Sequence, residues 1–76
     1  MMQFDQIFEI PPRHSLILLR HANEAGKLEE WRHEERDEAG RLVACYDSVE
    51  EASLRRGRFR KYDSQGRLIA EGELPA

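Results

Sequence analysis

The chain has 76 residues, of which 39% are hydrophobic and 36% are charged, and its formal net charge at pH 7 is −3. A chain of this length forms one domain at most and buries a smaller share of its surface than a large domain, which excludes an extensive core. Its single cysteine, Cys45, excludes an internal disulfide framework and is typical of a reducing compartment.

The first segment, residues 1–12, contains several apolar side chains and ends at two prolines. Phe4, Ile7 and Phe8 have the spacing of a helix, whereas Phe4, Phe8 and Ile10 have the spacing of a strand. The prolines end either element. We interpret the segment as an edge strand or an apolar arm that covers one face of a sheet.

One turn pattern occurs three times along the chain. Asn or Asp is followed by two residues, a glycine, a basic residue and leucine, at 23–28, 37–42 and 63–68. The first side chain accepts hydrogen bonds from backbone N–H groups ahead of it, and the glycine adopts the left-handed conformation that closes a hairpin. Gly26, Gly40 and Gly66 are therefore predicted to be structural turn residues.

The segments around these turns have the composition of strands. They are 14–22, predicted to be buried on both faces, the polar segment 28–36, the alternating segment 41–47, and the final pair 58–63 and 67–74. The sequence thus predicts a mainly β fold, an antiparallel meander of about five strands in a single domain, 1–76. The predicted core is Leu16, Ile17, Leu18, Leu19, Leu28, Trp31, Leu42, Val43, Ala44, Tyr46, Leu54, Phe59, Leu68 and Ile69.

Pairing Arg36 with Arg41 in the middle hairpin sets a register. It places Trp31 opposite Tyr46, and His33 opposite Ala44. The equivalent register in the last hairpin places Arg58 opposite Glu71, and Phe59 opposite Ala70. Aromatic pairs and pairs of opposite charge are favourable cross-strand neighbours, which supports this alignment.

A short helix is predicted over residues 49–56, between strands three and four. Ser48 to Glu51 has the pattern of a capping box, and acids come early and bases late in the segment. Gly57 is predicted to end the helix in a left-handed conformation.

The segment Tyr62-Asp-Ser-Gln-Gly-Arg-Leu68 resembles the YD-repeat unit of RHS-type proteins. In that family Tyr-Asp-x-x-Gly-Arg-Leu marks each hairpin. Tyr46-Asp47 lacks the Gly-Arg-Leu that would follow, and Arg36 stands where the motif has tyrosine. YD-repeat proteins are long arrays, so the resemblance implies hairpin geometry here and no function.

Charge is unevenly distributed along the chain. Residues 24–51 carry ten acidic and four basic residues, whereas residues 52–76 carry three acidic and six basic ones. Surfaces of opposite sign attract each other within a chain or between copies. Together with the small core, this favours a non-enzymatic protein-interaction module whose partner is a second copy, as a homodimer, or another protein.

The chain lacks a secretory signal and an apolar run long enough to cross a bilayer, so we expect a cytoplasmic protein without a membrane partner.

The soft metal ligands His14, His21, His33 and Cys45 lack zinc-finger spacing. His14 and His21, and likewise His33 and Cys45, are expected on opposite faces. The acidic run 29–38 is interpreted as a solvated face, so we expect no metal, no cofactor and no catalytic residue.

Two alternatives remain open. Single-stranded nucleic acid could bind the basic segment 55–61, although the acidic pI of about 5.6 argues against it. The same basic side chains would equally suit an acidic protein partner. They are Arg55, Arg56, Arg58, Arg60 and Lys61. A small ligand or substrate could instead bind in a concavity formed by Trp31, His33 and Tyr46.

Overall fold

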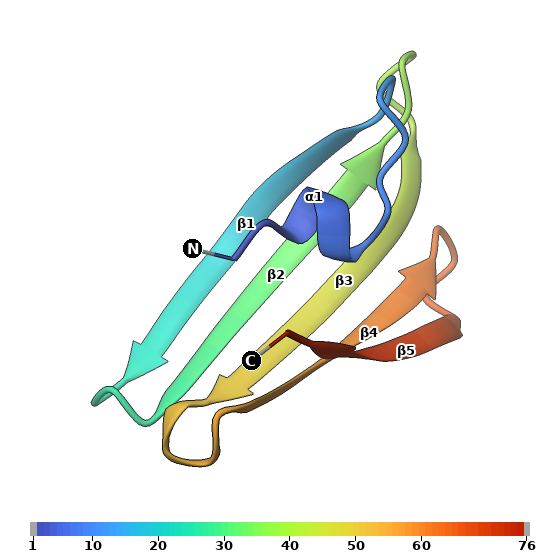
Figure 1. Cartoon of the computed structure of the whole chain (residues 1–76). Helices are drawn as coiled ribbons and strands as arrows, with labels where there is room; N and C mark the ends of the chain where they lie inside the picture. Colours follow the sequence, from blue (N-terminus) through green and yellow to red (C-terminus); the bar gives the residue numbers. More distant parts are fainter. Residues whose placement is uncertain (1, 76) are drawn as a thin grey trace.

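The computed structural model describes residues 2–75 and contains one antiparallel sheet with the strand order β1-β2-β3-β4-β5 (Figure 1). The strands are β1 (Ser15–Glu24), β2 (Leu28–Arg36), β3 (Leu42–Glu51), β4 (Arg56–Asp63) and β5 (Leu68–Leu74). A short helix, α1 (Phe4–Ile7), precedes them, and a 3-10 turn, η1 (Ala52–Leu54), lies between β3 and β4. The predicted five-stranded meander is confirmed.

The repeated turn pattern reverses the chain as expected. Gly26, Gly40 and Gly66 have φ values of +71°, +82° and +84°, in the left-handed region that favours glycine. In the β2–β3 turn, Asp37 Oδ1 accepts hydrogen bonds from the backbone N–H groups of Ala39 and Arg41, both at 2.9 Å. The turn between β4 and β5 repeats these contacts at the same distances. In the first turn Ala25 and Gly26 are both left-handed, and Asn23 Oδ1 accepts a hydrogen bond from the Gly26 N–H at 3.0 Å. Local turn chemistry therefore closes all three hairpins, the first with a different geometry.

The predicted register between β2 and β3 is wrong by two residues. Trp31 lies opposite Ser48, and His33 takes the position opposite Tyr46. The turn uses one residue more than expected, and a bulge beside it leaves Val43 outside the pairing. Because each insertion shifts the register by one, the two together return the side chains to the same faces.

The register of the last hairpin differs from the prediction in the same way. Arg58 lies opposite Glu73, and Phe59 opposite Gly72, each two positions beyond the expected partner. The extra residue of the bulge is Ile69. The two hairpins thus share their bulge as well as their turn.

The helix predicted over 49–56 is wrong in kind and in extent. Strand β3 continues through the first three of these residues, and only η1 is helical. Arg55, with φ +49°, adopts the left-handed conformation expected of Gly57, which lies buried in β4. Pairing on both sides of β3 satisfies more backbone groups than two isolated helical turns, which are marginal in water.

Helix α1 lies across one face of the sheet, in front of β2 and β3 in Figure 1. We call this covered surface the inner face and the opposite surface the outer face. The N-terminal segment is therefore a helical arm and not an edge strand. Phe8, which follows α1, is buried with Ala44 and Tyr46 beneath it, and Leu74 is also buried.

The predicted core is right only in part, because β1 and β5 are the edges of the sheet and only one short arm covers it; Leu16, Val43 and Phe59 pack against the buried cluster as expected. Strand β1, predicted to be buried on both faces, is mostly exposed. Among the predicted core residues, those with 42–62% exposure are Ile17, Leu18, Leu19, Leu54, Leu68 and Ile69. Ala44 and Tyr46 are the two that are fully buried.

Candidate functional site

A buried carboxylate lies on the inner face beneath the arm. Glu35 is 3% exposed, and its carboxylate accepts hydrogen bonds from the Tyr46 hydroxyl at 2.6 Å and from His14 Nδ1 at 2.5 Å. Burial disfavours the charged carboxylate, but these bonds and the nearby charge of Lys61 outweigh it, so the pKa of Glu35 lies below its usual value. Burial, and then the bond to Glu35, raises the pKa of Tyr46. The cluster holds an ionised carboxylate with one hydrogen bond to each of its oxygens.

Next to this cluster, His33 is enclosed by aromatic rings of the arm. Its ring centroid lies 4.6 Å from that of Phe4 and 5.8 Å from that of Phe8. Burial lowers the pKa of His33, which favours the neutral imidazole. Within residues 2–75, neither His33 Nδ1 nor Ser48 Oγ has a hydrogen-bond partner, although both atoms are buried.

The side chains proposed to form a ligand concavity do lie together on the inner face. Trp31 and His33 come from β2 and Tyr46 from β3. Phe4 lies 5.1 Å from the Trp31 ring, and Phe8 stacks on Tyr46 with a centroid distance of 4.0 Å. The protein's own phenyl rings therefore occupy the space that these three side chains border.

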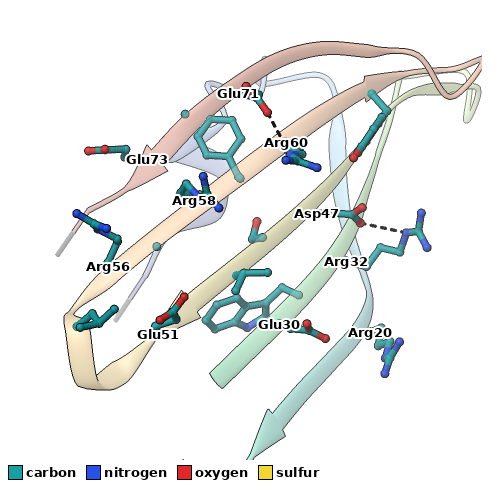
Figure 2. A pocket seen from close by; sticks show the side chains of 18 residues that line it. Arg20, Glu30, Arg32, Asp47, Glu51, Arg56, Arg58, Arg60, Glu71 and Glu73 are labelled. Atoms are coloured by element: carbon teal, nitrogen blue, oxygen red, sulfur yellow. Dashed lines mark ion pairs between the residues drawn. The ribbon is translucent and has the colours of Figure 1, made fainter. Parts of the chain in front are cut away.

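The outer face is hollowed and lined by charged side chains. Figure 2 shows five arginines and five acidic residues around this hollow, so their charges cancel. Arg32 pairs with Asp47 at 3.3 Å, and Arg60 pairs with Glu71 at 3.1 Å. The side chains in both pairs are about half exposed, and exposed pairs of this kind contribute little to stability.

The structure divides the basic segment between different surfaces. Arg56, Arg58 and Arg60 project from β4 on the outer face, where acids of β3 and β5 flank them (Figure 2). Lys61 lies on the inner face, with its ammonium 5.6 Å from the centre of the Tyr46 ring. Arg55 lies in the turn after η1. The five cations do not form one continuous surface.

The histidines follow a different pattern from the one expected. His14 bonds Glu35, and His21 stacks on Trp31 at 5.3 Å, so both contact inner-face groups. The prediction of opposite faces is wrong for His14 and His21, because Leu19 forms a bulge in β1 and reverses the alternation after it. It is confirmed for His33 and Cys45, which lie on the inner and outer faces. In residues 2–75, no group of three or more His, Cys, Asp or Glu side chains is arranged to hold a metal ion.

Both edges of the sheet expose apolar side chains. Strand β1 pairs with β2 on one side, and no strand among the described residues pairs with its other side. Ile17, Leu18 and Leu19 are 42%, 52% and 50% exposed there. At the opposite edge, β5 exposes Leu68 and Ile69. Five of the exposed large apolar side chains thus lie on the two edge strands.

Sequence reasoning missed the Glu35 cluster and the exposure of the edges. Strand parity could have placed Glu35 beside His33 and Trp31, since all three occupy alternate positions of one strand.

No helix described by the structure is long and apolar enough to span a bilayer. Comparisons with protein-family models, with curated proteins and with solved structures find no match to this chain.

Proposed function

We propose that the protein is a non-enzymatic interaction module that associates with further copies of itself through strand β1. The observation that carries this proposal is the exposed apolar run Ile17–Leu19 on an edge strand. A sheet edge presents unpaired backbone donors and acceptors, and an added strand satisfies them while it buries the side chains beside it.

The sequence of β1 lacks two common protections of an edge strand. Its ten residues include neither proline nor lysine, although the bulge at Leu19 and the charge of Arg20 protect the edge in part. Natural edges are usually blunted by such residues, by short length or by a covering segment. Strand β1 is as long as the central strand β3, which supports a role in pairing.

The nucleic-acid alternative has less support. Acidic side chains of β3 and β5 lie on either side of the β4 arginines on the outer face. A phosphate backbone along β4 would therefore meet carboxylates on both sides. Likewise, a small ligand near Trp31 would have to displace the rings of Phe4 and Phe8.

Light scattering coupled to size-exclusion chromatography tests the proposal. We expect the wild-type protein to have a mass above that of the monomer at micromolar concentration, and Leu19→Lys to lower it to the monomer. Leu54→Lys is the matched control, since Leu54 is 62% exposed but lies in η1, away from both edges. A wild-type protein that stays monomeric, or equal effects of the two variants, would contradict the proposal.

A further inference from the structure

We infer that the strand received by β1 is β5 of another copy, so that the copies add head to tail in one continuous sheet. This inference rests on the proposed self-association and names the two surfaces that meet. Residues that are paired across neighbouring strands form rows that run through the sheet from β1 to β5. The inference follows from the residues at the two ends of these rows.

One outer-face row begins and ends with apolar residues. It runs from Ile17 through Glu34, Cys45 and Tyr62 to Leu68. Both ends of the row are more than 40% exposed. When two copies lie side by side, Leu68 of one meets Ile17 of the next, and both apolar side chains lose contact with water.

A second row on the outer face has side chains of opposite charge at its two ends. It runs from Arg20 through Arg32, Asp47 and Arg60 to Glu71. Side-by-side copies therefore bring Glu71 of one next to Arg20 of the other, a favourable cross-strand pair.

Arg20 is poorly placed within its own sheet. It lies opposite Arg32, whose guanidinium pairs with Asp47 on the far side, and like charges directly opposite each other are destabilising. Among residues 2–75 Arg20 has no acidic partner. Glu71 bonds Arg60 and keeps an exposed carboxylate, which can accept from a second guanidinium.

The two edge strands also match in their irregularities. Leu19 is the inserted residue of β1, and Ile69 is the inserted residue of β5. Each insertion falls within the stretch between the two rows, which are three residues apart on both strands. A single alignment therefore satisfies both rows: Ile17 next to Leu68, and Arg20 next to Glu71.

Strand direction is consistent with this alignment. Alternate strands of an antiparallel meander run the same way, so β1 and β5 are parallel, and copies in the same orientation pair them in parallel. The contact joins two different surfaces and is therefore heterologous. A two-fold pairing of β1 with β1 would leave Arg20 without Glu71, and a pairing of β5 with β5 would leave Glu71 without Arg20, so neither joins the two opposite charges.

Charge reversal at the two edges tests the inference. Arg20→Glu and Glu71→Arg each place like charges at every contact, so each variant alone should self-associate about tenfold more weakly than the wild type. An equimolar mixture should recover association, because the introduced carboxylate of one variant then meets the introduced guanidinium of the other. Arg55→Glu, an exposed reversal in the turn before β4, is the control. Analytical ultracentrifugation measures the wild type, the two variants, their mixture and the control, and circular dichroism confirms that each variant is folded.

The outcomes separate this inference from the proposed function. Weaker association of both variants with recovery in the mixture supports head-to-tail pairing. Association that is unchanged in both variants, or altered by Arg20→Glu alone as a two-fold β1 contact predicts, overturns this inference and leaves self-association standing. A monomeric wild-type protein overturns both.

Discussion

Replacing Tyr46 by phenylalanine removes one hydroxyl from the most buried part of the molecule. The ring stays stacked on Phe8 at 4.0 Å, so packing is retained, while Glu35 loses the bond at 2.6 Å. A hydrogen bond to a charged group contributes about 1.5–3 kcal/mol, and its loss leaves a carboxylate oxygen that is shielded from water. Because His14 still donates to Glu35, we expect the free energy of unfolding to fall by about 2 kcal/mol.

Urea unfolding followed by the fluorescence of Trp31 measures this loss. A decrease of that size corresponds to a fall in Tm of about 8–16 °C for a domain of this length. Tyr62→Phe is the matched control, since Tyr62 lies on the outer face and is only partly buried. If Tyr46→Phe changes the free energy of unfolding by less than about 0.5 kcal/mol, the hydrogen bond does not stabilise the cluster and the reasoning is refuted.

Two further predictions concern pH and the turns. Burial lowers the pKa of His33 in the folded protein. The imidazole therefore binds a proton more readily in the unfolded chain, and the free energy of unfolding should fall as the pH decreases through about 6.5. His33→Phe should reduce this loss, measured as the free energy of unfolding at about pH 8 and about pH 5.5; an unchanged pH dependence would contradict the assignment. At Gly66, where φ is +84° and a Cβ atom would meet nothing, alanine should cost about 1–2 kcal/mol from backbone strain alone. Asparagine at the same position should cost less, and equal thermal denaturation midpoints for the two variants would be evidence against this explanation.

The hairpins could be predicted from the sequence because each turn depends on residues within a few positions of its glycine. The register could not, because the bulges at Val43 and Ile69 add a residue without an unusual side chain to mark it. The helix prediction over 49–56 failed for a related reason. Its capping pattern is local, whereas the pairing of β3 on both sides is a property of the sheet.

The candidate sites were predictable only in part. Strand parity correctly placed Arg58 and Arg60 on one face and Lys61 on the other. It could not show that the arm fills the inner face, because the segment around Phe4 and Phe8 has no pairing pattern of its own. The exposure of the apolar run in β1 was missed because a continuous apolar run is typical of a strand buried on both faces, and no proline or lysine marks β1 as an edge.

The arm has a consequence for the order of assembly. It precedes every strand in the chain, yet the surface that it covers includes Phe59 of β4, 5.0 Å from Phe8. During synthesis the arm therefore leaves the ribosome well before its docking surface is complete. It can dock on Trp31 and Tyr46 once β2 and β3 have paired, but its contact with Phe59 forms only after the fourth strand has joined the sheet.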